Sequence, residues 1–154
     1  MTGKFETKLF ALGITLPDAP APAANYVPFV VSDDIVYVSG QISKDDYGLT
    51  VGKLGQSMTT EEGAAAARIC GINLLAQVKA ACDGDLDRLV QVIKLTGFVN
   101  STDNYKEQPK VINGASDLMA EVLGEAGRHA RSAVSAAALP FGVAVEIEGT
   151  FKIK

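Results

Sequence analysis

Apolar and polar residues alternate most regularly at the C-terminal end of the chain. From Val143 to Ile153 every second residue is apolar or glycine, and Glu146 and Glu148 fall on intervening positions. Because successive side chains of a strand point to opposite faces, this pattern predicts a strand with one buried face and one polar face. A Leu-Pro turn at 139–142 comes just before it, so we expect a hairpin with the preceding strand.

Two other segments follow the period of an α-helix. The first opens with Thr59 and Glu62, which have the spacing of a capping box, and continues to about Cys82. The second begins near Pro109, a residue that suits the first turn of a helix, and ends at Gly124. Its apolar residues share one face and are Val111, Ile112, Ala115, Leu118, Met119, Val122 and Leu123. We expect both helices to pack on a sheet.

The remaining segments are shorter and complete an α+β chain. We expect a short helix at 5–12, a Pro/Ala-rich surface linker at 15–25, paired strands at 26–31 and 35–40, a glycine-rich loop at 43–55 with a short strand near 49–53, and a buried strand within 86–100. Together these elements predict a mixed sheet with two helices packed on one face. Residues 1–154 then form one domain, with 1–23 as an N-terminal extension.

Composition narrows the classes of function. The chain has 154 residues and a net charge of −4, so a nucleic-acid partner, which needs a surplus of Lys and Arg, is not expected. It has no long apolar run and no signal-peptide pattern, which predicts a cytoplasmic protein without a membrane partner. Cys70 and Cys82 lie about 18 Å apart along one predicted helix, too far for a disulfide. With His129 as the only histidine, no metal site is expected.

Arg131 is the first candidate for a binding residue. A guanidinium presents a planar fork of donors that suits a carboxylate ligand. The residues after it are small and leave room beside a long side chain: Ser132, Ala133, Ser135, Ala136, Ala137 and Ala138. The alternative is an ordinary ion pair between Arg131 and an Asp or Glu of the protein.

Glu146 either belongs to a ligand site or lies on a solvated outer face of the last strand. In the expected hairpin Glu146 pairs near Val134, and Arg131 pairs near Gly149. The two charged residues are then three positions out of register, about 10 Å along the strands. If both serve one small ligand, a neighbouring copy of the chain supplies one of them, so this offset indicates an oligomer.

Several stretches together resemble a known family. YVPFV with VYVSGQ, NGA on the second long helix, and ARSAV followed by LP and VEIE are similar in order and interval to the reactive intermediate deaminase family, also called the RidA or YjgF family. The resemblance covers residues 24–150. It implies a chorismate-mutase-like fold, assembled as a homotrimer with sites in the clefts between subunits. It also implies hydrolysis, without a cofactor, of small enamines and imines such as 2-aminoacrylate to 2-keto acids and ammonia.

The same resemblance implies roles for individual residues. Arg131 would hold the carboxylate of a small imino or keto acid, and Glu146 would orient or activate the attacking water. The residues implied in substrate binding are Tyr26, Ser39, Gly40, Asn113 and Arg131. Residue patterns alone leave other interpretations open: Tyr26 as an interface aromatic, Asn113 as a helix-surface amide, and Ser39-Gly40 as a turn at a strand end.

The chain also departs from the family pattern. Ala133 stands where many members have a cysteine, and Phe141-Gly142 stands where charged residues are common. The chain also has extra length at the N-terminus and in 44–58, and the stretches NYVPF, TGFVNS and EQPKV indicate a longer-chain subgroup. A module that binds 2-keto acids in the same cleft without turnover is the alternative function. His129, two residues before Arg131, is either a group that tunes the charge of the site or a helix cap.

Overall fold

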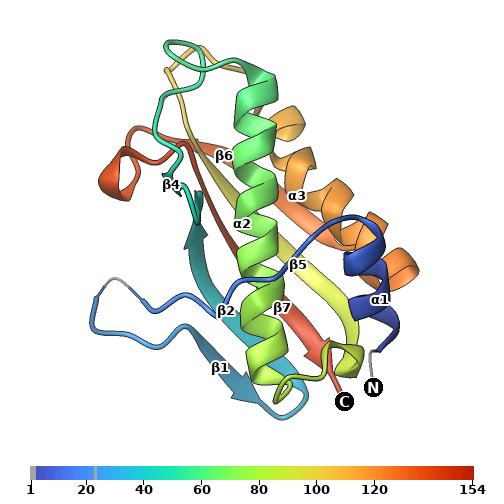
Figure 1. Ribbon diagram of the computed structural model, residues 1–154. Helices are drawn as coiled ribbons and strands as arrows, with labels where there is room; N and C mark the ends of the chain where they lie inside the picture. Colours follow the sequence, from blue (N-terminus) through green and yellow to red (C-terminus); the bar gives the residue numbers. More distant parts are fainter. Residues whose placement is uncertain (1–2, 23) are drawn as a thin grey trace.

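In the computed structural model, which describes residues 3–22 and 24–154, two long helices lie on one face of a five-stranded sheet (Figure 1). The elements are α1 (Lys4–Ala11), β1 (Phe29–Ser32), β2 (Ile35–Ile42), β3 (Lys44–Asp45), β4 (Gly48–Leu49), α2 (Thr60–Ala81), β5 (Leu89–Asn100), α3 (Gln108–Leu123), β6 (Ala130–Ala136) and β7 (Val145–Ile153). This order confirms the predicted α+β layers. One residue of the predicted linker, Ala23, lies outside the described residues.

The strand order in the sheet is β1-β2-β7-β5-β6. β5 and β6 are parallel, and the other neighbours are antiparallel, so the sheet is mixed as predicted. The expected hairpin between the last two strands is wrong, because β5 lies between β6 and β7 and pairs with both. The turn between them, which includes the short helix Pro140–Gly142, crosses over β5. The sequence pattern identifies the turn and the two strands, but it does not show which strands become neighbours in the sheet.

The predicted boundaries hold for the helices and shift for some strands. Thr59 and Glu62 form the predicted capping box of α2, each side chain bonding the other's backbone N–H. β1 begins at Phe29 rather than 26, directly after Pro28, which has no N–H to donate to a sheet. β5 begins at Leu89, after a short 3-10 helix over Leu86–Arg88. The loop after β2 holds the small β3–β4 hairpin.

The core lies between the sheet and the two long helices. Alternate residues of β7 are buried against them, as the sequence predicted, while the intervening ones are more exposed. Cys70 and Cys82 are free and buried in this core, which confirms the prediction that they are reduced packing residues. The helices approach closely at Gly114, where a Cβ would lie 1.9 Å from the carbonyl oxygen of Ala64. Any larger residue at position 114 would therefore push α3 away from α2.

The other face of the sheet is not covered by the described residues of the chain. Strand pairing places Val30 opposite Tyr37 on this open face, and Val134 beside Phe98 on the same face. Val30, Tyr37 and Val134 remain 53%, 51% and 46% exposed. Exposed apolar side chains on one broad face are typical of a surface that another protein covers.

Candidate substrate-binding site

Arg131 extends from the edge strand β6 toward α3. It pairs in the sheet with Leu95, a core residue, so both side chains lie on the helix side. Its Nη1 donates to Asn113 Oδ1 at 2.8 Å and to Ser116 Oγ at 3.2 Å, and its Nη2 donates to the Pro109 carbonyl at 3.4 Å. Three acceptors along one side of α3 therefore hold the guanidinium in place.

The alternative interpretation of Arg131 as an ordinary ion-pair residue fails within the described residues. Six ion pairs occur there, and Arg131 takes part in none of them. Its partners are neutral oxygens, so they orient the guanidinium without neutralising it. A fixed, partly exposed positive charge of this kind is suited to an anionic ligand.

Asn113 and Arg131 were both predicted as substrate-binding residues, and in the structure the amide oxygen of Asn113 accepts directly from Arg131. Ser116 and the Pro109 carbonyl were missed as partners. The signal for Ser116 was present in the sequence, since Asn113 and Ser116 are three residues apart and therefore neighbours on the surface of one helix. Polar residues at that spacing flank the apolar stripe of α3.

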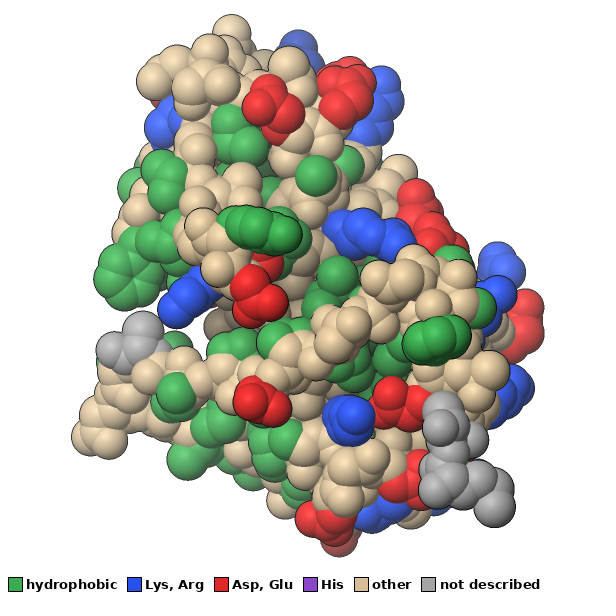
Figure 2. All heavy atoms as spheres, viewed as in Figure 1, with side chains coloured by type: hydrophobic (Ala, Val, Ile, Leu, Met, Phe, Trp, Pro, Cys, Tyr) green, Lys and Arg blue, Asp and Glu red, His purple; other side chains and the backbone are tan. Residues whose placement is uncertain are grey.

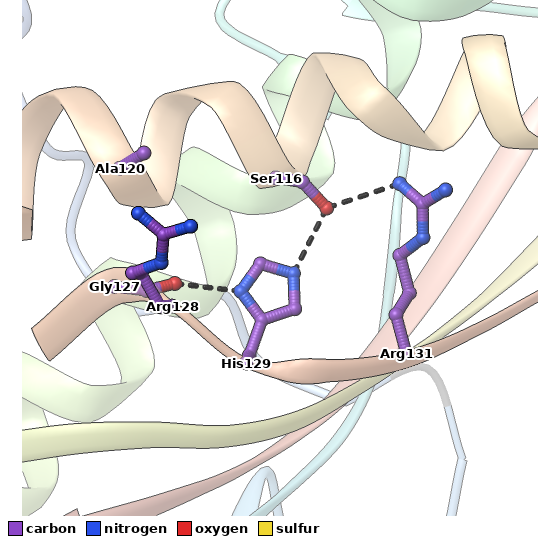
Figure 3. Close-up of a pocket in the computed structure, with 6 residues that line it drawn as sticks. All are labelled: Ser116, Ala120, Gly127, Arg128, His129 and Arg131. Atoms are coloured by element: carbon purple, nitrogen blue, oxygen red, sulfur yellow. Dashed lines mark hydrogen bonds between the residues drawn. The ribbon is translucent and has the colours of Figure 1, made fainter. Parts of the chain in front are cut away.

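His129 lies at the end of the same cluster (Figure 3). Its Nδ1 is 2.6 Å from the Gly127 carbonyl and its Nε2 is 2.9 Å from Ser116 Oγ. Ser116 thus stands between the imidazole and the guanidinium of Arg131, with a hydrogen bond to each. With Arg128 and Ala120 these residues line a shallow surface pocket. The histidine therefore touches the arginine's partner and not the arginine itself.

Glu146 lies in a second cluster, beside Gly40. The pairing of β2 with β7 is irregular between Val38 and Gln41, which places a bulge at Ser39-Gly40. A Cβ at Gly40 would lie 2.6 Å from Glu146 Oε2, so only glycine lets the carboxylate lie there undisturbed. Burial, and after it the nearby charge of Glu148, raise the pKa of Glu146 above its ordinary value.

Ser39 and Tyr26 belong to the same end of the molecule as Gly40. Ser39 Oγ donates to the carbonyl of Val27 at 2.9 Å, which ties β2 to the segment before β1. Tyr26, one residue earlier, is 48% exposed. The arginine cluster therefore contains Ser116 beside the predicted Asn113, His129 and Arg131. The glutamate cluster contains Gly40 and Glu146 with Ser39 next to Gly40, and Tyr26 adjoins it through Val27, whose carbonyl accepts from Ser39.

The two clusters face opposite sides of the sheet. Arg131 and Gly149 both pair with Leu95, whereas Val134 and Glu146 both pair with Phe98. Residues paired across neighbouring strands share a face of the sheet, whereas residues three positions apart along one strand point to opposite faces. The predicted offset of three residues is therefore real, but it spans β5 and separates the two side chains by face as well as along the strands.

The described residues also bear on two other kinds of partner, a metal ion and a membrane. Among them, no three His, Cys, Asp or Glu side chains are arranged to hold a metal ion. In the same part of the chain, no helix is both long and apolar enough to cross a membrane. Acidic and basic side chains are interspersed over the helix side of the molecule (Figure 2).

Comparison with known proteins places this architecture in a fold class and then in a family. The mixed sheet with helices on one face is a chorismate-mutase-like fold. Residues 6–147 match the family described as "YjgF/chorismate mutase-like, putative endoribonuclease", and the chain belongs to this YjgF, or RidA, family. The resemblance seen in the sequence is thereby confirmed. Because the description includes endoribonuclease, the expectation that a nucleic-acid partner is excluded has no support from the comparison.

Individual relatives agree with this assignment. The chain is 50% identical to Protein TCP17 of Trypanosoma cruzi over 99% of its own length and 96% of that protein. It is 48% identical to Atu1372 of Agrobacterium tumefaciens, a protein of unknown function, with a TM-score of 0.91 over 97% of this chain and 92% of that one. RidA of an Antarctic Psychrobacter is 28% identical, with a TM-score of 0.59 over 88% and 94%. By this measure Atu1372 is the more similar of these two structures.

Proposed function

We propose that this protein hydrolyses small 2-imino acids, and their enamine tautomers, to 2-keto acids and ammonia. The observation that carries the proposal is the setting of Arg131. Three neutral oxygens of α3 fix its guanidinium, and no carboxylate of the described chain neutralises it. Its two-pronged donor geometry suits the carboxylate of such a substrate.

In the proposed reaction Arg131 binds the carboxylate and thereby positions the imine carbon. Glu146 orients a water molecule and accepts a proton as the water oxygen bonds to that carbon. That proton passes to the nitrogen and gives a carbinolamine. The hydroxyl proton of the carbinolamine then moves to the amino group as the carbon–nitrogen bond breaks and the carbonyl forms, so ammonia and the 2-keto acid leave. The imine is already electrophilic, so positioning and proton transfer suffice. The raised pKa of Glu146 favours both acceptance and return of the proton.

We propose further that Arg131 and Glu146 of one site come from two copies of the chain in a homotrimer. The two side chains lie on opposite faces of one sheet, which supports a site shared between subunits. The exposed apolar residues of the open face, Val30, Tyr37 and Val134, are available to bury against neighbouring subunits. Tyr26, Ser39 and Gly40 of the second subunit then complete the cleft beside Glu146.

The test is the release of ammonia and pyruvate from 2-iminopropionate, generated in solution by an amino-acid oxidase. We expect the wild-type protein to accelerate release over the protein-free reaction, and Arg131→Ala to lose this effect. Asp117→Ala, on the exposed side of α3, serves as the matched control. Failure of the wild type to accelerate release would refute the proposed hydrolysis.

Two other outcomes are informative. Pyruvate binding that depends on Arg131, with no turnover, would assign the cleft to recognition of 2-keto acids. Cleavage of single-stranded RNA by the wild type, lost in Arg131→Ala, would assign the cleft to the endoribonuclease activity in the family description. Either result would replace the proposed reaction.

A further inference from the structure

A continuous chain of hydrogen bonds runs from the backbone at Gly127 to the guanidinium of Arg131. It passes through His129 Nδ1 and Nε2 and then through Ser116 Oγ, with distances of 2.6, 2.9 and 3.2 Å. Figure 3 shows the serine hydroxyl between the two basic side chains. The proposed reaction uses Arg131 but leaves the serine and the histidine without a role.

The chemistry of each group fixes the direction of these bonds. A backbone carbonyl only accepts, so His129 Nδ1 carries the proton and donates to Gly127. In the neutral imidazole Nε2 is then an acceptor, and Ser116 must donate its hydroxyl proton to it. The serine oxygen keeps its lone pairs free to accept from Arg131 Nη1. The histidine thus holds the serine in the orientation in which it accepts from the arginine.

We infer that Ser116 and His129 are positioning residues that set the substrate-binding orientation of Arg131. The inference rests on the proposed carboxylate-binding role of Arg131 and extends it to two residues that do not touch the substrate. The bond from His129 Nδ1 to Gly127, the last residue of the short 3-10 helix Gly124–Gly127, is that of a helix cap, and the bond at Nε2 adds the positioning role. The nearby Arg128 belongs to a separate, exposed pair with Glu125 at 3.8 Å.

The first test is the protonation of the imidazole in the ligand-free protein. Because His129 is the only histidine, ¹⁵N NMR of histidine-labelled protein gives one pair of ring resonances. At a pH where the ring is neutral we expect Nδ1 to be protonated and Nε2 unprotonated. We also expect Ser116→Ala and Arg131→Lys to shift the Nε2 resonance. A ring protonated at Nε2, or a resonance that neither variant moves, would overturn the inference.

The second test separates substrate affinity from chemistry. We expect Ser116→Ala to raise the KM for 2-iminopropionate and the Kd for pyruvate about fivefold, because the guanidinium loses one of its acceptors, while kcat stays within about twofold. Asp117→Ala, one residue away on the exposed side of α3, should change neither constant. A Kd within twofold of the wild type in Ser116→Ala would contradict a positioning role.

Two histidine variants give the matched comparison. His129→Gln places an amide oxygen near the position of Nε2 and keeps an acceptor for Ser116, so it should retain most of the affinity. His129→Asn keeps a donor near the position of Nδ1 but has no acceptor there, so it should resemble Ser116→Ala. Equal constants for the two variants would overturn the role of Nε2. If the wild type turns over no imine, the hydrolysis fails as a function, while the NMR shifts and pyruvate Kd still decide this inference.

Discussion

The arginine cluster and the glutamate cluster are built in different ways. Arg131 makes three hydrogen bonds to α3, and one of its partners is itself held by His129. Within the described residues, the carboxylate of Glu146 accepts no hydrogen bond, and a bulge at Gly40 keeps the space beside it open. One cluster is complete in a single chain. The other is partly buried yet unpartnered, as expected of a group whose partners are a substrate, a water or another subunit.

The charge states of the two clusters also differ, because their charged side chains have different surroundings. A guanidinium stays protonated in proteins, and its neutral partners leave that charge intact. Burial, and after it the charge of Glu148, raise the pKa of Glu146, so this carboxylate is protonated more easily than an ordinary glutamate. This difference is consistent with the roles proposed above, a fixed binding group at Arg131 and a proton-exchanging group at Glu146.

The largest expected effect is that of removing the fixed group. Arg131→Ala should lower kcat/KM for 2-iminopropionate by roughly 10³-fold, mainly through substrate binding, because a charge-assisted pair with the carboxylate is lost. Arg131→Lys keeps a point charge without the planar fork and should recover only part of the loss. The measurement is steady-state kinetics with thermal melting as the folding control, and full activity in Arg131→Ala would remove this cluster from the site.

Removing the proton-exchanging group should affect chemistry and not binding. Glu146→Gln should lower kcat by about 10²-fold, the ordinary contribution of a general base, with KM little changed. In the wild type, kcat should fall as the pH drops through the raised pKa of Glu146, and Glu146→Gln should lose this dependence. A variant with unchanged kcat but raised KM would make Glu146 a binding residue.

The same substitution makes a prediction about stability. A carboxyl group whose pKa is raised by folding binds its proton more readily in the folded state than in the unfolded state. Its charged form therefore lowers stability at neutral pH, and this penalty disappears as the pH falls through the raised pKa. Glu146→Gln should accordingly keep or raise Tm at pH 7. A clearly lower Tm would point to a structural role for the carboxylate.

An intermediate effect is expected from the open face of the sheet. Val134→Asp places a charge where an exposed valine is available for burial between subunits. It should raise the protein concentration needed for trimer formation by at least about tenfold, because an unpaired charge resists burial. Analytical ultracentrifugation measures this shift, and Ala80→Asp, at an exposed position of α2 on the helix side of the sheet, is the control. Unchanged association would place the subunit contacts elsewhere.

The smallest expected effect tests the space beside Glu146. Gly40→Ala would put a Cβ 2.6 Å from Glu146 Oε2, so the carboxylate must move aside. Because that oxygen ends a flexible side chain, the fold should survive while kcat falls by about tenfold. Kinetics on 2-iminopropionate provide the measurement. An unchanged kcat would show that the carboxylate works equally well from a displaced position.

Sequence patterns predicted the helices and strands themselves better than they predicted which strands pair in the sheet. Alternation in β7, the capping box of α2 and the apolar stripe of α3 each depend on local physics, and each matched the structure. The hairpin before β7 did not, because the choice of β5 as the neighbour depends on contacts between segments far apart in the chain.

The candidate site shows the same division. Asn113 came from resemblance to a family, and its contact with Arg131 depends on how α3 lies over β6. Ser116 was detectable only as a polar residue three positions from Asn113. The link through Ser116 from His129 to Arg131 joins a helix to the strand that follows it, which no single periodic pattern describes.

The central claim is that one site takes Arg131 from one chain and Glu146 from its neighbour, and mixed trimers test it most directly. Arg131→Ala and Glu146→Gln chains carrying different tags are co-expressed, purified through both tags and assayed with 2-iminopropionate. Each mixed trimer of a cyclic assembly should regain activity at one of its three sites, because an intact arginine and an intact glutamate meet at only one of its three subunit contacts. Mixed trimers no more active than the two parents would contradict the shared site.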